Sequence, residues 1–132
     1  MAEKKQESKA KILIFDDSDF ARKNIIQILE EEKFQVIGEA STAQTAGDLL
    51  TSTKANILIM DLMMPEKSGL ELTKHFKENF RELSIIIISS LSQEQVIVDC
   101  LAQGACDFIK KPFKRHVLVD SIAKIENGLK ED

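Results

Sequence analysis

The segment ILIFDDSDF, residues 12 to 20, decides the fold and raises the question of function. Four apolar residues run directly into three carboxylates, which belong to Asp16, Asp17 and Asp19. An unbroken aliphatic run predicts a strand that is buried on both faces, as in a parallel sheet. Carboxylates crowded at the end of such a strand repel one another and oppose folding. The segment therefore predicts a buried strand whose acidic end has a function.

The rest of the chain repeats this pattern of a strand followed by a helix. The predicted strands cover residues 11–15, 34–40, 56–60, 84–88 and 106–110. Between and after them, apolar residues recur at helical spacing. The residues that carry the helical periods are Ala21, Ile25, Ile28 and Leu29, then Ala43, Ala46 and Leu50, then Leu72, Phe76 and Phe80, then Ile97 and Leu101, and finally Leu118, Ile122, Ile125 and Leu129. Because parallel strands need crossover helices, we expect an α/β fold with a five-stranded, doubly wound parallel sheet.

Local signals predict where several helices begin and end. Three capping boxes place a hydroxyl residue three positions before Glu or Gln. They pair Ser41 with Gln44, Ser68 with Glu71, and Ser92 with Gln95. Gly104 stands where the fourth helix should stop, because glycine adopts the left-handed conformation most easily. For the first helix, which is expected near Phe20, Asp16, Asp17 or Asp19 could serve as the N-cap.

Length and composition limit the classes of protein that the chain can belong to. The 132 residues fit one domain, which we expect to span residues 10–129 between a charged tail at 1–9 and a short end at 130–132. The net charge of -4 argues against a nucleic-acid-binding protein. No targeting segment is evident, and the apolar runs fall short of a membrane span. These features predict a cytoplasmic protein that binds neither membranes nor nucleic acid.

The cysteines and histidines are interpreted as ordinary structural residues. Cys100 and Cys106 lack a second Cys or His pair at ligand spacing, so we expect two small buried side chains in a reducing compartment. His75 is read as a partly exposed helix residue beside Phe76, not as a phosphohistidine.

Polar residues gather where the predicted strands end. In a doubly wound sheet, ligands bind at the carboxyl ends of the strands, near the reversal in strand order. The residues at those ends are Asp16, Asp17, Asp61, Ser89, Ser90, Lys110, Lys111 and Pro112. Three carboxylates in mutual contact would repel by on the order of 12 kcal/mol, which is comparable with the net stability of a domain. A shared Mg²⁺ ion, which prefers carboxylate and carbonyl oxygens, would relieve this repulsion best.

At residues 10–129 the chain resembles a response-regulator receiver domain of the CheY-like type, which has the flavodoxin-like (βα)5 fold. The resemblance rests on four motifs in the expected order. These are the acidic pair Asp16-Asp17, the segment DLMMPEKSG from Asp61 to Gly69, the hydroxyl residue Ser89, and the segment KPF from Lys111 to Phe113.

The resemblance implies a phosphorylation site that depends on Mg²⁺. Asp61 would be the phospho-acceptor and would form an acyl phosphate. Asp16 and Asp17 would hold Mg²⁺ together with Asp61 and the backbone carbonyl of Met63. No other cofactor is implied.

The resemblance also implies which residues respond to the phosphoryl group. Ser89 would bond one of its oxygens, and Lys111 would pair with it. Phe108 falls where the family carries a rotamer-switching aromatic residue. The Lys111-Pro112 bond matches the family's cis peptide.

By resemblance, the protein would be a single-domain response regulator in a two-component or phosphorelay system. A histidine kinase would donate the phosphoryl group, and a downstream protein would bind through the surface of the fourth helix, fifth strand and fifth helix. Chemotaxis control and an intermediate phosphorelay step are the pathways considered. The protein would catalyse only its own phosphorylation and slow dephosphorylation. We expect a monomer that could dimerise on phosphorylation.

Two positions depart from what fast hydrolysis requires. Met63 and Leu91, two residues after the acceptor and the hydroxyl respectively, are apolar. Neither can orient a water for attack on an acyl phosphate. The sequence therefore predicts slow self-hydrolysis and a partner phosphatase or back-transfer.

The sequence leaves three other functions open. The chain could be the receiver of a larger transcriptional regulator. It could also be a hydrolase, since Asp17-Ser18-Asp19 resembles the D-x-D motif of haloacid-dehalogenase-type phosphatases. A phosphate-independent pseudo-receiver is the third alternative, and the complete acidic set with Lys111 argues against it.

Overall fold

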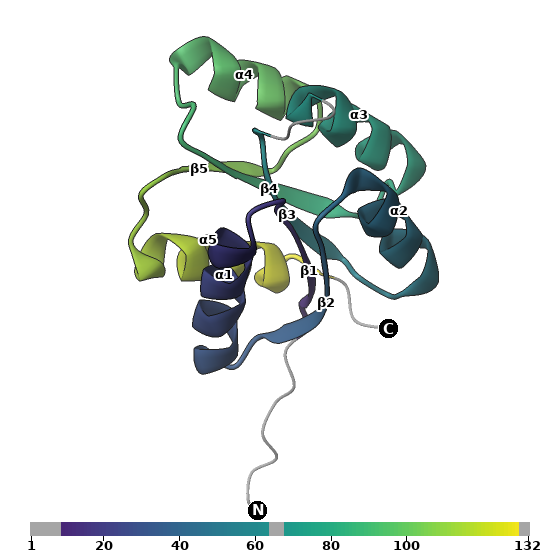
Figure 1. Cartoon of the computed structure of the whole chain (residues 1–132), viewed down its shortest axis with the longest axis vertical. Helices are drawn as coiled ribbons and strands as arrows, with labels where there is room; N and C mark the ends of the chain where they lie inside the picture. The colour runs from purple at the N-terminus through teal and green to yellow at the C-terminus, as the bar shows by residue number, and fades with distance from the viewer. Residues whose placement is uncertain (1–8, 64–67, 130–132) are drawn as a thin grey trace, which may run out of the picture.

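A computed structural model describes residues 9–63 and 68–129, in which five parallel strands form one sheet of order β2-β1-β3-β4-β5 (Figure 1). The strands are β1 Lys11–Phe15, β2 Gln35–Ala40, β3 Ile57–Asp61, β4 Ser84–Ser89 and β5 Asp107–Lys110. The helices are α1 Asp19–Glu31, α2 Ala43–Ser52, α3 Gly69–Asn79, α4 Glu94–Ala102 and α5 Arg115–Asn127. The predicted doubly wound α/β fold is confirmed. The predicted tail, apart from Lys9, and the end at 130–132 lie outside the described residues.

Two hydrophobic cores lie on opposite faces of the sheet. Alternate residues of each strand enter different cores, so that Ile12 and Ile14 pack on one face while Leu13 and Phe15 pack on the other. Helices α1 and α5 cover the first face, and α2, α3 and α4 cover the second. This arrangement explains the continuous aliphatic runs, because every side chain of an inner strand must be apolar when both faces are covered.

The strand order reverses between β1 and β3. The chain leaves β1 to form the edge strand β2, then returns to the other side of β1 and continues through β3 and β4 to β5. Ligands of doubly wound sheets bind at the carboxyl ends of the two strands that flank such a reversal. The two strands here end at Phe15 and Asp61. The fold thus places the acids of the opening segment beside Asp61.

Three helix starts differ from the predicted ones. Ser18 is the N-cap of α1 and accepts a hydrogen bond from the Ala21 N–H, so none of the three nearby aspartates has that role. The Ser41 box is wrong by one residue, because the neighbouring Thr42 caps α2 by accepting from the Thr45 N–H. Because Ser41 and Thr42 both carry a hydroxyl group, the loop geometry decides which of them caps the helix.

The Ser92 box is also wrong. Helix α4 begins at Glu94, after an N-cap residue, Gln93, whose side chain makes no capping bond. The loop after β4 is held instead by Ser89, whose hydroxyl accepts a hydrogen bond from the Leu91 N–H. After Leu91 the loop continues through Ser92 and Gln93 before the helix starts. The Ser68 N-cap is confirmed, since its hydroxyl accepts from the backbone N–H groups of Leu70 and Glu71.

Gly104 ends α4 as predicted, and its backbone has a φ of +115°. A β-carbon added there would lie 2.6 Å from the Lys77 Cγ. We expect Gly104→Ala to lower the free energy of unfolding by about 1 to 2 kcal/mol, because alanine is strained at this φ and has no room. Urea unfolding followed by circular dichroism measures the change.

Gly47→Ala is the matched control for that measurement. Gly47 lies inside α2, and the nearest atom to an added β-carbon is 4.0 Å away, on the Phe76 ring. Because alanine favours a helix interior more than glycine does, this variant should be about 0.5 to 1 kcal/mol more stable than wild type. Equal effects at the two glycines would contradict the explanation.

Among the described residues, no helix has the length and apolar content needed to cross a membrane.

Candidate functional site

The polar side chains at the carboxyl ends of four elements converge at one place. Asp16 follows β1, Asp61 is the last residue of β3, Ser89 is the last residue of β4, and Lys111 follows β5. The Lys111 Nζ lies 2.8 Å from the Asp61 Oδ2 and 3.7 Å from the Asp16 Oδ2. One ammonium group therefore lies beside two carboxylates that are 45 residues apart in the sequence.

Asp16 is the most deeply buried of these acids. Its side chain is 3% exposed, and its Oδ1 accepts a hydrogen bond of 2.9 Å from the Ser18 N–H. Burial raises the pKa of Asp16, and the nearby carboxylates of Asp61 and Asp17 act in the same direction. The Ser18 N–H and the Lys111 ammonium lower this pKa and offset part of the shift. A further cation beside Asp16 would stabilise its charged form.

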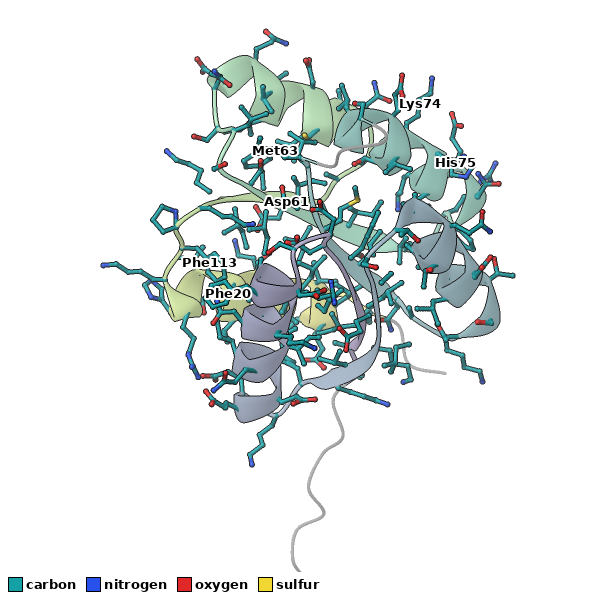
Figure 2. All side chains as sticks on the ribbon, in the orientation of Figure 1. Phe20, Asp61, Met63, Lys74, His75 and Phe113 are labelled. Carbon is teal, nitrogen blue, oxygen red and sulfur yellow. The ribbon has the colours of Figure 1, made fainter. Side chains whose placement is uncertain are left out.

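Asp61 is more accessible and is held in a fixed orientation. Its side chain is 13% exposed. The Oδ1 accepts a 2.9 Å hydrogen bond from the Met63 N–H, while the Oδ2 pairs with Lys111. Figure 2 shows Asp61 at the end of its strand with Met63 close by. The carboxylate can thus be reached by a second molecule while both of its oxygens have defined partners.

Ser89 and Lys111 are joined through the main chain. Ser89 is buried, and its carbonyl oxygen accepts a 2.9 Å hydrogen bond from the Lys111 N–H. The Lys111-Pro112 peptide bond is cis, as predicted. Phe108 is half-buried in β5 and packs against the core beneath α2, α3 and α4. These residues lie where the resemblance places them, and their response to phosphorylation remains a prediction.

The other two acids of the opening segment do not join Asp16 and Asp61. Asp17 is exposed, and Asp19 forms an ion pair of 2.6 Å with Arg22. Within residues 9–63 and 68–129, no cluster of three or more His, Cys, Asp or Glu residues is arranged to hold a metal ion. Asp17 thus lies outside the group that Asp16, Asp61 and Lys111 form in this structure.

Sequence reasoning missed Arg22. Its side chain is 9% exposed although it is charged, and it bonds Asp19, Glu39 and the Asp16 carbonyl oxygen. A signal was present, since Arg22 lies three and seven positions before Ile25 and Leu29, on the buried face of α1.

Both cysteines are free thiols, as predicted, but only Cys100 is buried. Cys106 is exposed, contrary to the prediction, because it precedes β5 in a loop at the edge of the sheet. His75 is exposed on α3, with its ring 5.7 Å from that of Phe76, and it lies away from Asp61 (Figure 2).

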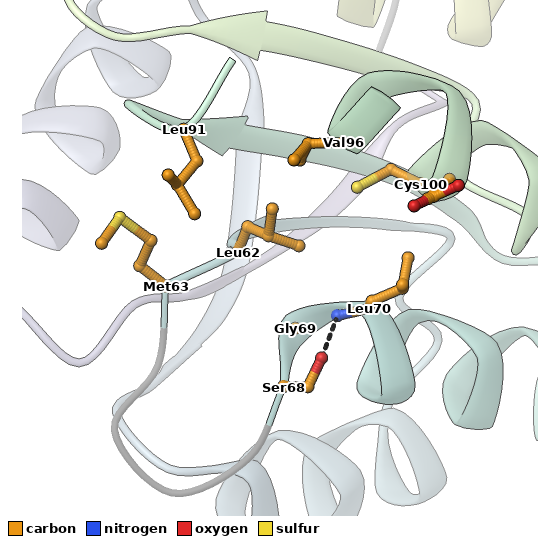
Figure 3. Close-up of a pocket in the computed structure, with 9 residues that line it drawn as sticks. Leu62, Met63, Ser68, Gly69, Leu70, Leu91, Val96 and Cys100 are labelled. Atoms are coloured by element: carbon orange, nitrogen blue, oxygen red, sulfur yellow. Dashed lines mark hydrogen bonds between the residues drawn. The ribbon is translucent and has the colours of Figure 1, made fainter. Parts of the chain in front are cut away.

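A cavity of about 510 Å³ opens beside the carboxyl end of β3 (Figure 3). Its walls are mainly apolar and include Leu62, Met63, Leu70, Leu91, Val96 and Cys100. Met63 and Leu91 are 50% and 38% exposed, and the Ser90 hydroxyl lies 3.5 Å from the Met63 sulfur. The surface on this side of Asp61 is therefore apolar and offers a water molecule few hydrogen-bond partners.

Comparison with known proteins assigns the chain to a class of signalling domain. The family model for the response regulator receiver domain matches residues 12–123. The chemotaxis protein CheY of Bacillus subtilis is 33% identical over 117 residues, covering 89% of this chain and 98% of that protein. CheY of Halobacterium salinarum is 32% identical over 114 residues, covering 86% of this chain and 94% of that protein.

A solved structure supports the same assignment. The CheX-CheY-BeF3-Mg complex of Borrelia burgdorferi matches with a TM-score of 0.80 and 29% identity, covering 88% of both chains. The protein belongs to the response regulator receiver domain family.

Proposed function

We propose that this receiver domain, residues 10–129, accepts a phosphoryl group on Asp61 from a histidine kinase and signals by binding a downstream protein. The observation that carries the proposal is the pair formed by Asp61 and Lys111, 2.8 Å apart, beside the buried Asp16. A partly exposed carboxylate flanked by an ammonium group suits phosphoryl transfer, which depends mainly on positioning and on neutralisation of charge.

The proposed reaction moves one phosphoryl group. An Asp61 oxygen attacks the phosphorus of a phosphohistidine, an O–P bond forms, and the P–N bond breaks. The histidine nitrogen leaves with the bonding electron pair, and its ring retains or takes up a proton from water. Lys111, which pairs with the Asp61 Oδ2, would face the oxygens of the incoming group, and the Met63 N–H would hold the Asp61 Oδ1 in place. Ser89 would turn its hydroxyl toward the phosphoryl group.

The residues present fit a Mg²⁺ ion. They provide hard oxygen donors, and burial raises the pKa of Asp16, so a cation would favour its charged form. Asp16, Asp17, Asp61 and the Met63 carbonyl would hold the ion, and Asp17 would have to turn inward. When bound, Mg²⁺ would neutralise charge on the phosphoryl oxygens. The CheY of the Borrelia burgdorferi complex was solved with BeF3 and Mg²⁺.

The proposed output surface consists of α4, β5 and α5. Three large apolar side chains are exposed on these helices, namely Val98 and Leu101 on α4 and Val117 on α5. The added charge would draw Ser89 toward Asp61 and keep Lys111 beside it. Phe108 would then turn inward to fill the space that Ser89 leaves. We propose a monomer in the cytoplasm whose partner, in a chemotaxis-like or phosphorelay pathway, binds this surface after phosphorylation. The free thiols agree with that compartment.

A specific similarity favours a second candidate, the receiver of a transcriptional regulator. The chain is 24% identical to the regulatory protein DegU of Brevibacillus brevis, of which it covers 55%. A regulator of this kind would use the surface of α4, β5 and α5 to pair with a second copy. Sedimentation with and without beryllofluoride tests the regulator function, because a monomer that stays unchanged when beryllofluoride is added would argue against it.

Incubation with acetyl phosphate, with and without Mg²⁺, tests the proposed function. We expect up to one base-labile phosphoryl group per chain, formed only when Mg²⁺ is present. Sustained release of phosphate without a labelled protein would instead indicate a hydrolase. The pairing of Asp19 with Arg22 argues against that outcome, because it removes the second acid of the D-x-D motif. No label under either condition would indicate a pseudo-receiver.

A further inference from the structure

Arg22 makes three hydrogen bonds with three different nitrogens. Its Nε donates to the Glu39 carboxylate at 2.7 Å, its Nη1 to the Asp16 carbonyl oxygen at 2.8 Å, and its Nη2 to the Asp19 carboxylate at 2.6 Å. These acceptors come from β2, from the end of β1 and from the start of α1. A planar guanidinium can bridge three acceptors in fixed directions, whereas an ammonium group cannot span them.

Both main-chain polar groups of Asp16 are hydrogen-bonded. Its N–H donates to the Ala40 carbonyl at 3.1 Å, and its carbonyl accepts from Arg22. The Asp16 Oδ1 is bound by the Ser18 N–H, and the Oδ2 is the oxygen that faces Lys111. The direction in which Asp16 presents its carboxylate therefore depends on the loop that Arg22 anchors.

Arg22 also separates the acids of the opening segment. It binds the Asp19 carboxylate directly, so one of the three nearby negative charges is neutralised by Arg22 and not by Lys111. The remaining two, Asp16 and Asp17, flank the peptide group whose oxygen Arg22 holds. The guanidinium thus contacts the main chain of the acid pair without touching either of its carboxylates.

We propose that Arg22 is a positioning residue for cation binding: it fixes the loop after β1 so that Asp16 and Asp17 can hold Mg²⁺ together. The inference rests on the proposed function, because it takes the acid pair to be the Mg²⁺ ligand. Groups that orient metal ligands without binding the metal commonly change the affinity 10- to 100-fold when removed.

The direction in which the Mg²⁺ affinity changes when Arg22 is replaced distinguishes a positioning role from a purely electrostatic one. Arg22 is a positive charge near a cation site, so its removal would strengthen Mg²⁺ binding if charge alone mattered. A positioning role predicts the opposite. We expect Arg22→Gln to weaken Mg²⁺ binding about tenfold. Arg22→Lys, which retains the charge but cannot span the three acceptors, should weaken it similarly.

Isothermal titration of the full chain with MgCl₂ measures the dissociation constant, and circular dichroism confirms that each variant is folded. Arg115→Gln is the matched control, because Arg115 forms its ion pairs with Glu31 and Glu32 at the other end of α1. It should leave the constant within about twofold of wild type. If Arg22→Gln does not fold, the dissociation constant of Arg22→Lys is compared with that of wild type instead.

The outcomes separate this inference from the proposed function. If wild type does not bind Mg²⁺, the proposed function itself fails. If wild type binds Mg²⁺ but a folded Arg22 variant binds it equally well or more tightly, the positioning role is overturned and the proposed function stands.

Discussion

Replacing Asp61 with Asn should abolish phosphoryl labelling of the protein by acetyl phosphate in the presence of Mg²⁺. The amide retains the shape of the side chain, but it lacks the anionic oxygen that would attack phosphorus and form an acyl phosphate. Asp61 also has the accessibility that the reaction needs, whereas the Asp16 side chain is only 3% exposed. The label is measured by intact-protein mass spectrometry before and after mild base, which hydrolyses acyl phosphates.

Asp48→Asn is the matched control, because it also replaces a carboxylate with an amide. Asp48 is exposed on α2, where its carboxylate accepts a hydrogen bond from Gln44, and it should label like wild type. Persistent labelling of Asp61→Asn would show that another residue is the acceptor, and the assignment of Asp61 would then be wrong.

Replacing Met63 with Asn should shorten the lifetime of the phosphorylated protein, with a hydrolysis rate on the order of tenfold faster. Met63 is half exposed, donates its N–H to Asp61, and lines an apolar cavity with Leu91. An amide at this position can hold a water molecule near the phosphorus, which methionine cannot do. Loss of label after removal of the phosphodonor measures the rate.

Met63→Leu separates this effect from a change of packing. Leucine has a similar volume and no polar atom, so the phosphorylated protein should decay as slowly as wild type. The explanation is wrong if wild type already loses its phosphoryl group within seconds, or if the Asn and Leu variants decay at the same rate.

The fold could be predicted from the sequence because its signals are local and repeated. Three aliphatic runs mark strands buried on both faces, and β1 has the predicted bounds, Lys11–Phe15. Parallel pairing then brings distant strand ends together, which explains why Asp16, Asp61 and Lys111 could be placed at one site before any distance was known.

The errors concern choices that depend on three-dimensional contacts. Neighbouring hydroxyl residues compete for a cap, so Thr42 replaces Ser41 once the loop geometry is fixed. Arg22 escaped notice because two of its acceptors, Glu39 and a backbone carbonyl, are not apparent from the sequence around it. Asp17 is exposed, and the sequence motif does not specify which way its side chain turns.

The position of Lys111 has a mechanical consequence. Lys111 follows the edge strand β5, yet its ammonium group reaches past β4 to a carboxylate on the central strand β3. A force transmitted along this side chain is opposed at β5 by one ladder of main-chain hydrogen bonds and at β3 by two. We therefore expect the edge of the sheet to yield first, so that phosphorylation of Asp61 on the central strand would displace β5 more than β3.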